Sequence, residues 1–245
     1  NLMLDIVSTR TDGYHNLFMI MQSVGVYDTV TVKSTSSKKI IITCDKADIP
    51  TDKKNIAYKA AEAFFTATKI QNKGVSIDIK KNIPHAAGLA GGSADGAAVI
   101  VALNKIYGTN LSNDELCDIG VKVGADVPFC ICGGTLLSQG IGDVLNKVKP
   151  LRKCYILLAK PNFGVNTGYA YSMFDKNGKV HTPDKLGMLY AMQSRDLTQI
   201  CSKMENVFEQ FIEVPNRVTM KEIMRKHNAL GACMSGSGPT VFGIY

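Results

Sequence analysis

Pro84-His-Ala-Ala-Gly-Leu-Ala-Gly-Gly-Ser-Ala94 is the stretch that decides how this chain folds. Its small residues let the backbone come close to a ligand. A helix expected over residues 97–107 follows it, and a helix N-terminus offers free N–H groups and a partial positive charge to an anion. Ser93 is suited to cap that helix or to turn its hydroxyl toward a phosphate. The stretch predicts an anion-binding loop, although a tight turn that only packs a helix on a strand explains the glycines at least as well.

The loop is neither of the two commonest phosphate-binding motifs. No Gly-Lys-Ser/Thr follows it, as a P-loop requires, and its glycines are not spaced as G-x-G-x-x-G. A second small-residue loop, Met234-Ser-Gly-Ser-Gly-Pro239, follows a strand-like segment near the end of the sequence. Two such loops could converge on one polyphosphate, but their spacing alone does not establish this.

The elements expected around the loops mix strands and helices without a strict repeat, which favours the α+β class. A turn is expected at Thr11-Asp-Gly-Tyr-His15. Strands are expected over residues 2–7, 18–32, 39–44, 75–79, 127–137, 154–160 and 241–245. Helices are expected over residues 55–69, 97–107, 112–124 and most of 182–228, the third opened by the capping box Ser112-Asn-Asp-Glu115. A weakly marked boundary between residues 151 and 162 divides the chain into domains of residues 1–152 and 153–245.

The composition is that of an ordinary globular protein. Of the 245 residues, 45% are hydrophobic and 20% charged, and no apolar run approaches the roughly 18 residues of a membrane span. The net charge of +7 is scattered, whereas a nucleic-acid binder more often concentrates it in a stripe. Seven cysteines without C-x-x-C or zinc spacing predict reduced thiols in a cytoplasmic protein and no metal site. A cysteine nucleophile is the minor alternative.

Five segments, in order, resemble the GHMP kinase superfamily, most closely the kinases of 4-diphosphocytidyl-2-C-methyl-D-erythritol. They are Asn1-Leu-Met-Leu, Arg10-Thr-Asp-Gly-Tyr-His15, Pro84 to Ala94, Gly124-Ala-Asp-Val-Pro128 and Met234 to Pro239. Together the second and fourth segments distinguish these enzymes from mevalonate, homoserine and galactose kinases. The resemblance implies a two-domain fold, with an N-terminal domain like ribosomal protein S5 domain 2 and a ferredoxin-like C-terminal domain.

The resemblance also implies a reaction. ATP, brought with Mg²⁺, would phosphorylate the 2-hydroxyl of the cytidine diphosphate-linked methylerythritol, a step of the non-mevalonate route to isoprenoids. The partners implied are these two small molecules, with no nucleic acid and no membrane, in a monomer or weak homodimer. Two alternatives stay open: a GHMP kinase for a smaller alcohol, and an inactive GHMP-fold nucleotide sensor.

The resemblance carries over onto individual residues. Asp126 would receive the hydroxyl proton, Tyr14 would stack on cytosine, His15 would hydrogen-bond to it, and Tyr171 would supply a second aromatic face. The substrate set is Asn1, Tyr14, His15, Asp126, Thr167 and Tyr171. The ATP set is Asn55 and Lys81 near the adenine, with Pro84, His85, Ala86, Ala87, Gly88, Leu89, Ala90, Gly91, Gly92, Ser93 and Ala94.

The residues alone permit plainer interpretations of the same positions. Asp126 could simply close a turn, and Tyr14-His15 could be an exposed turn. Tyr171 could be a core tyrosine of a helix, and Lys81 a solvated lysine at a strand end.

The chain departs from the family pattern in three places. The family lysine would stand two positions before Asn1, so a truncated N-terminus is expected. The family continues with a helix and a strand where this chain stops, so the C-terminal domain is also expected to be truncated. Ala90 and Ala94 stand where the family more often has Gly and Ser, while Gly91, Gly92 and Ser93 keep the phosphate cradle.

Overall fold

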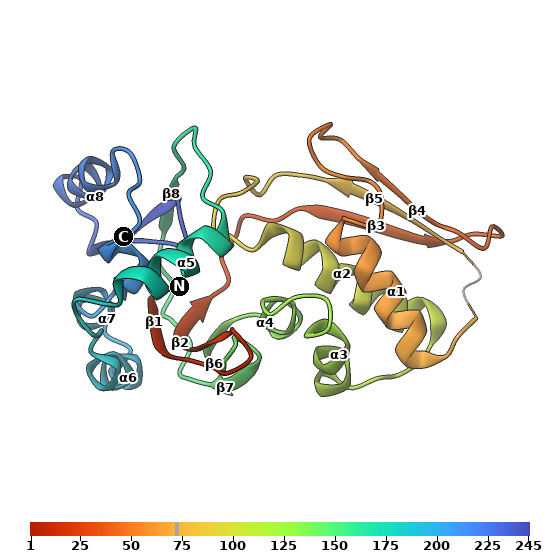
Figure 1. Cartoon of the computed structure of the whole chain (residues 1–245), viewed down its shortest axis with the longest axis horizontal. Helices are drawn as coiled ribbons and strands as arrows, with labels where there is room; N and C mark the ends of the chain where they lie inside the picture. Colours follow the sequence, from red (N-terminus) through yellow and green to blue (C-terminus); the bar gives the residue numbers. More distant parts are fainter. Residues whose placement is uncertain (72–73) are drawn as a thin grey trace. The chain divides into compact units, whose positions relative to one another are not determined.

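The computed structural model describes residues 1–71 and 74–245, which form two compact units. The first unit consists of Asn1–Val24, Pro84–Leu89 and Gly134–Tyr245, and the second of Gly25–Ile83 and Ala90–Gly133 (Figure 1). The stretch singled out in the sequence therefore lies where the chain passes from the first unit into the second. The division at residue 152 stays a prediction.

The second unit packs helices on one face of a three-stranded sheet (Figure 1). The central strand, β5 (Val75–Lys80), pairs antiparallel with β3 (Thr29–Ser34) and parallel with β4 (Ile40–Cys44). The helices are α1 (Ile56–Thr68), α2 (Gly91–Tyr107), α3 (Asn113–Gly120) and α4 (Val127–Cys132). Val75, Ile77 and Ile79 alternate in the sequence with Ser76, Asp78 and Lys80, and only the three apolar residues are buried, as a strand with one face in the core requires.

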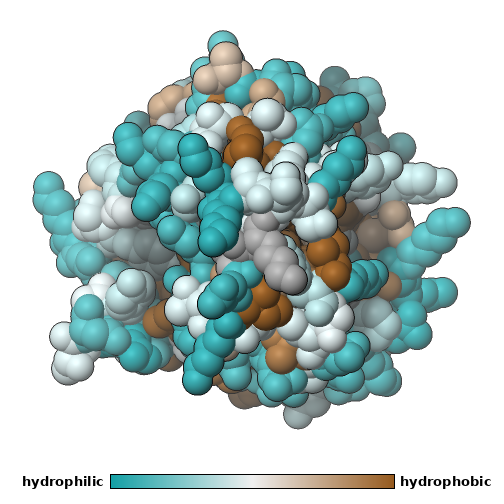
Figure 2. All heavy atoms as spheres, turned by 90° about the vertical axis from the view of Figure 1, so that its right-hand side faces the viewer, coloured by the Kyte–Doolittle hydropathy of each residue, from teal (hydrophilic) through white to brown (hydrophobic). Residues whose placement is uncertain are grey.

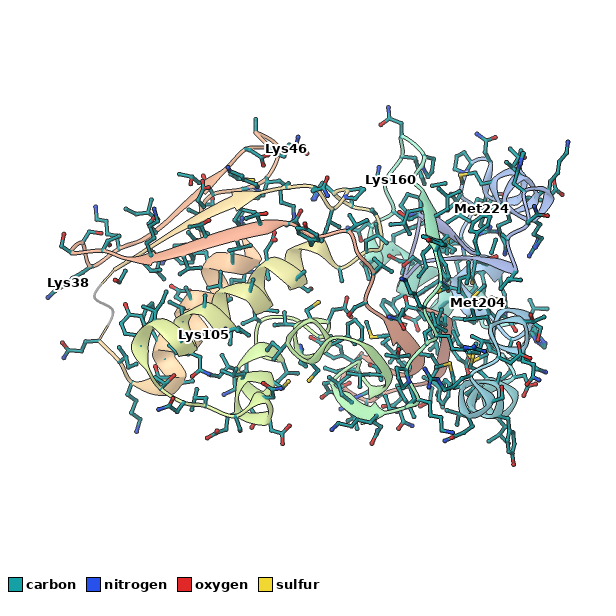
Figure 3. All side chains as sticks on the ribbon, turned by 180° about the vertical axis from the view of Figure 1, so that it is seen from behind. Lys38, Lys46, Lys105, Lys160, Met204 and Met224 are labelled. Carbon is teal, nitrogen blue, oxygen red and sulfur yellow. The ribbon has the colours of Figure 1, made fainter. Side chains whose placement is uncertain are left out.

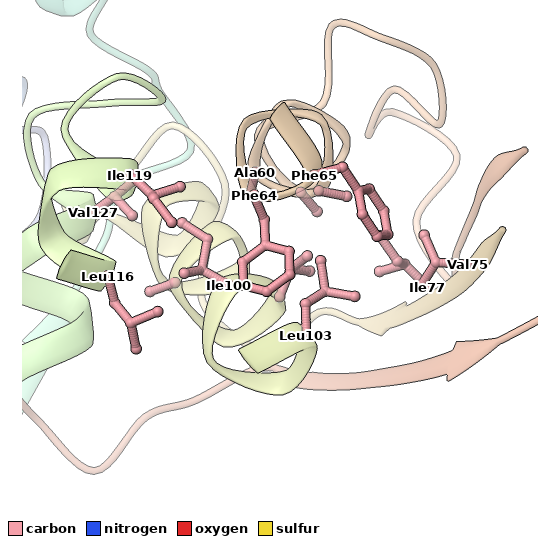
Figure 4. Close-up of a cluster of buried hydrophobic side chains, with 14 of the residues drawn as sticks. Ala60, Phe64, Phe65, Val75, Ile77, Ile100, Leu103, Leu116, Ile119 and Val127 are labelled. Carbon is pink, nitrogen blue, oxygen red and sulfur yellow. The ribbon is translucent and has the colours of Figure 1, made fainter. Parts of the chain in front are cut away.

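The core of the second unit joins the sheet to all four of these helices, with Leu116 and Ile119 coming from α3. Phe64 of α1 and Ile100 of α2 are fully buried there with Ile77 of β5, and Val127 of α4 reaches the same cluster (Figure 4). The capping box at Ser112 is confirmed: its Oγ accepts from the Glu115 N–H, and the Glu115 carboxylate accepts from the Ser112 N–H. Because Val127 is anchored in the core, the residue before it has a fixed backbone.

The first unit contains two sheets and the remaining helices. The five-stranded sheet has the order β7 (Val144–Lys147), β6 (Thr135–Gly140), β2 (His15–Gln22), β1 (Met3–Thr9) and β9 (Glu205–Asn206). The three-stranded sheet has the order β10 (Gly231–Met234), β11 (Val241–Ile244) and β8 (Ile156–Ala159). The helical elements are α5 (Thr167–Asn177), α6 (Lys185–Ser194), α7 (Leu197–Ser202), the 3-10 turn η1 (Val207–Gln210) and α8 (Arg217–Lys226).

Two expected strands are correct only in part. The segment 127–137 is helix α4 followed by β6, because Pro128 lies in the first helical turn, where its missing N–H removes no helical hydrogen bond. Gly133, at φ 67, then ends that helix. The segment 18–32 is two strands, β2 and β3, which belong to different sheets in different units. Apolar and β-branched residues predominate on both sides of each break, between Gln22 and Thr29 in one segment and at Gly133-Gly134 in the other, which hides both changes.

Charged side chains are spread over the surface, as expected from their scatter in the sequence. Lys38 and Lys46 lie at the margins of the ribbon (Figure 3), and the face in Figure 2 is mostly hydrophilic with small, separate apolar spots. Over residues 1–71 and 74–245, no helix is long and apolar enough to cross a membrane. All seven cysteines are free, and burial raises the pKa of the Cys130 thiol to about 12, which argues against a cysteine nucleophile there.

Candidate functional site

The two small-residue loops meet within the first unit. The Ser235 hydroxyl donates a hydrogen bond to the Gly88 carbonyl at 2.8 Å. Gly88 has a φ of +69°, and a Cβ placed on it would lie 2.3 Å from the Ser235 carbonyl oxygen. Only a glycine allows this approach, because real Cβ atoms essentially never come so close to backbone. The two loops are therefore in contact, as binding of one polyphosphate by both of them would require.

Helix α2 begins at Gly91, six residues earlier than expected. Its N-cap is Ala90, in the left-handed conformation with φ 52°, and no side chain caps it. Ser93 lies inside the first turn, so its predicted role as N-cap is wrong. The first N–H groups of a helix have no hydrogen-bond partner within the helix. In α2 these N–H groups belong to residues with small side chains, which leave room for a ligand to approach. The end of the loop can thus present backbone donors to an anion.

Lys81 is not a solvated strand-end lysine. Its side chain is only 7% exposed, and its ammonium pairs with Asp28 and, at 2.8 Å, with Asp95. Burial raises the pKa of the Asp95 carboxyl to about 6, with the charge of Lys81 opposing the shift. Burial acts on Asp28 in the same direction, but hydrogen bonds from Lys81 and two backbone amides outweigh it and lower its pKa. Asp28 was not recognised in the sequence, since 53 residues separate it from Lys81.

Asp126 stands at the N-cap position of α4, but its side chain makes no capping hydrogen bond. The next three residues, Val127-Pro-Phe129, are buried. Gly120 of α3 packs so closely on Val127 that an added Cβ would lie 2.9 Å from its Cγ1. Burial raises the pKa of the Asp126 carboxyl. A rigid backbone therefore presents a carboxylate with increased proton affinity, which is what a proton acceptor near neutral pH needs.

The proposed cytosine-binding residues gather in the first unit. The His15 ring stacks on Tyr171 with centroids 4.8 Å apart, and His15 Nε2 lies 2.7 Å from Asp175 Oδ1. His15 is buried and begins β2, whereas Tyr14 is 60% exposed. Thr167 opens α5, and its hydroxyl lies 3.2 Å from that of Ser237 in the second small-residue loop. Tyr14 and His15 are therefore not both part of an exposed turn.

Two residues that the sequence did not reveal hold the second small-residue loop. Asn206 is 1% exposed, and its amide donates to the carbonyls of Met234 at 2.9 Å and Gly236 at 2.8 Å. Glu209 accepts from the Met234 N–H at 2.7 Å and pairs with Lys221. Asn1 adds a hydrogen bond of 2.9 Å from the Gly236 N–H. No spacing rule links these positions, because they meet only through the fold.

Asn55 is buried and caps α1. Its Oδ1 accepts from the Ala57 N–H at 2.8 Å, and its Nδ2 donates to the Pro50 carbonyl at 2.6 Å. The side chain therefore supports the start of a helix, and its predicted contact with adenine stays a prediction.

Comparison with known proteins matches both halves of the chain to one family. The GHMP kinases N terminal domain matches residues 55–134, and the GHMP kinases C terminal domain matches residues 188–245. The chain belongs to the GHMP kinase family. The 4-diphosphocytidyl-2-C-methyl-D-erythritol kinase of Clostridium perfringens (strain SM101 / Type A) is 45% identical over 100% of this chain and 85% of its own length. The enzyme of that name from Clostridium acetobutylicum is 44% identical over 100% of this chain and 88% of its own length.

Solved structures agree with the fold. A crystal structure of 4-(cytidine 5'-diphospho)-2C-methyl-D-erythritol kinase matches with a TM-score of 0.75 and 28% identity, covering 100% of this chain and 86% of that one. Homoserine kinase from Cytophaga hutchinsonii matches with a TM-score of 0.77 at 21% identity, over 94% of this chain and 79% of its own, which supports the fold alone. The GHMP kinase resemblance and the α+β fold class are confirmed. The chain is an ATP-dependent kinase.

The left-handed backbone at position 90 suits a glycine better than the alanine that stands there. A non-glycine residue in this conformation lowers the stability of the folded protein by about 1–2 kcal/mol. A glycine avoids this strain, but it makes the unfolded chain more flexible, which lowers the free energy of unfolding by about 0.4–1 kcal/mol. Ala90→Gly is therefore expected to raise the free energy of unfolding by about 0.5–1 kcal/mol, measured by urea denaturation. Ala98→Gly, at an exposed position within α2, is the control and should lower it by about 1 kcal/mol. Equal losses in both variants would contradict the assigned strain at position 90.

Proposed function

We propose that this kinase transfers the γ-phosphoryl group of ATP to the 2-hydroxyl of 4-diphosphocytidyl-2-C-methyl-D-erythritol, in the non-mevalonate route to isoprenoid precursors. The observation that carries the choice of acceptor is the stack of His15 on Tyr171 next to the exposed Tyr14. Aromatic faces bind nucleobases at about 1–3 kcal/mol per stacked base in nucleic-acid complexes. Asp175 accepts a hydrogen bond from His15 Nε2–H and so fixes the ring, which leaves Nδ1 of the neutral tautomer to accept a hydrogen bond from the cytosine amino group. A small alcohol would need no such platform.

ATP is proposed to bind as its Mg²⁺ complex along the loop from Pro84 to Ala94. Two features support this: the free donors at the start of α2 and the close packing of Gly88 against the second small-residue loop. Mg²⁺ arrives with the nucleotide as part of the substrate and neutralises charge on the phosphate oxygens.

Asp126 is proposed to accept the proton of the attacking hydroxyl. Phosphoryl transfer asks the protein mainly for positioning and charge stabilisation, and a placed base adds to this. The raised pKa of its carboxyl and the absence of a capping bond both leave Asp126 suited to take up a proton.

Phosphorylation assays with a panel of acceptors test the proposal. The full-length protein is expected to release ADP with 4-diphosphocytidyl-2-C-methyl-D-erythritol and not with mevalonate or homoserine. Turnover with either of these, and none with the cytidyl compound, would favour the GHMP kinase for a smaller alcohol. Nucleotide binding without turnover of any acceptor would favour the inactive nucleotide sensor.

A further inference from the structure

The buried cluster Asp28–Lys81–Asp95 brackets the phosphate loop, with all three residues in the second unit. Lys81 directly follows β5 and opens the short segment 81–83 that leads into the loop. Asp95 lies in the first turns of α2, the helix that leads out of it. We call residues 81–83 the entering stem and residues 91–95 the leaving stem.

Asp28 holds every residue of the entering stem. Its Oδ1 accepts from the N–H groups of Asn82 at 2.5 Å and Ile83 at 2.8 Å, and its Oδ2 accepts from the Lys81 ammonium. The Asp28 side chain is only 2% exposed, so water competes little for these bonds. A single carboxylate therefore fixes three consecutive residues directly before Pro84.

The same ammonium ties the entering stem to the leaving stem. Lys81 Nζ donates to Asp95 Oδ2 at 2.8 Å. A Cβ added to Gly91, the first residue of α2, would lie 3.0 Å from Ile83 Cγ2 and 3.4 Å from Lys81 Nζ. The helix start is thus packed directly on the ion pair and on the entering stem. A substitution in the cluster is therefore expected to shift the backbone at both ends of the loop.

The charges of the cluster do not balance, which argues against a purely stabilising role. Two carboxylates share one ammonium, and Asp95 Oδ1 is buried without a hydrogen-bond partner. Buried ion pairs contribute little net stability compared with apolar side chains of the same size. What such a cluster does provide is a defined geometry, since each bond fixes the position of one stem.

We propose that Asp28 is a positioning residue for the nucleotide: acting through Lys81 and Asp95, it holds the two stems of the phosphate loop at the separation that the ATP phosphates require. The inference rests on the proposed binding of ATP along this loop. It assigns Asp28 and Asp95 to nucleotide affinity and not to contact with the acceptor.

Titration of Mg·ADP into the full-length protein tests the inference without any acceptor, so its outcome is independent of which alcohol is phosphorylated. Asp28→Asn and Asp95→Asn preserve side-chain size and remove one charge each. Each is expected to raise the Kd of Mg·ADP and the KM of ATP about tenfold, with the acceptor KM and kcat changed less than about twofold.

Asp5→Asn is the matched control. Asp5 is a fully buried carboxylate that pairs with Lys179 and Lys185 in the first unit, outside the loop stems. It should lower the melting temperature and leave the Kd of Mg·ADP unchanged. If Asp28→Asn and Asp95→Asn only lower the melting temperature, or raise the acceptor KM as much as that of ATP, the inference is overturned.

A pH series separates positioning from general destabilisation. Asp95 faces Lys81 and Asp28, and the Cys130 thiol of α4 also lies within its electrostatic range. Since the Asp95 carboxyl has a pKa of about 6, the wild type loses the Lys81–Asp95 ion pair as the pH falls through that value. The Kd ratio of Asp95→Asn to wild type should shrink from about tenfold near pH 7.5 to about threefold near pH 5.5, while titration of the ligand cancels in the ratio. A ratio that does not change with pH contradicts the assigned role of the ion pair.

Discussion

Asp126→Asn is expected to lower kcat by about 10²- to 10⁴-fold, the usual contribution of a placed general base, with little change in ATP affinity. The asparagine keeps the size of the side chain and cannot accept the proton of the attacking hydroxyl. The backbone should not move, because Val127-Pro-Phe129 is buried and Gly120 packs on Val127. Single-turnover kinetics with saturating ATP and acceptor measure the effect on the transfer step.

Asp118→Asn is the control for charge alone, since Asp118 is an exposed aspartate of α3 in the same unit. Its kcat should match that of the wild type. An unchanged kcat in Asp126→Asn would remove Asp126 from the mechanism.

The same substitution is expected to stabilise the folded protein. Burial raises the pKa of the Asp126 carboxyl, so the native state binds its proton more tightly than the unfolded chain does. The ionised carboxylate therefore destabilises the native state above that pKa, and this penalty is relieved as the pH falls through it. At neutral pH the neutral asparagine avoids the penalty, and Asp126→Asn should melt at a higher temperature than the wild type. In the wild type, kcat should fall with decreasing pH as the base becomes protonated.

The sequence predicted elements whose pattern is local. The alternation in β5, the apolar spacing of α1 and the capping box of α3 each depend on neighbours within a few residues, and all three are confirmed. The pattern failed at α4, where an apolar segment fits either a strand or a buried helix, and where Pro128 in the first turn, Gly133 at the end and the packing of Val127 on Gly120 all accompany the helix.

The site was predictable only in part, for the same reason. Motif resemblance found the loop and Asp126, because each of them lies within a short continuous segment of the sequence. It did not find Asp28 or Asn206, because their roles arise from bonds to residues 53 and 28 positions away. The interpretation of Lys81 from the residues alone was wrong, since a lysine at a strand end is usually solvated and nothing local reveals two buried carboxylates.

Gly88→Ala is expected to have the second large effect, on both folding and nucleotide binding. Residues 86, 88 and 90 all have left-handed backbone, with φ values of 49°, 69° and 52°. Strain of about 1–2 kcal/mol from the added Cβ would combine with overpacking of about 1–3 kcal/mol, because its neighbours are the carbonyl oxygens of Ser235 at 2.3 Å and Gly238 at 3.0 Å. These atoms are backbone and cannot rotate away, so the two small-residue loops must separate. We expect a loss of about 2–5 kcal/mol of unfolding free energy and an increase of more than about tenfold in the KM of ATP.

Gly108→Ala separates the backbone strain from the overpacking against the second small-residue loop. Gly108 ends α2 with a φ of +60°, close to that of Gly88, but an added Cβ would have no neighbour within 4 Å. It should therefore show the strain alone, about 1 kcal/mol, with an unchanged KM for ATP. The difference between the two variants measures what the contact between the loops contributes. If both variants lose the same stability and keep the same affinity for ATP, the loops can move apart without consequence, and their close approach at Gly88 is not what shapes the nucleotide site.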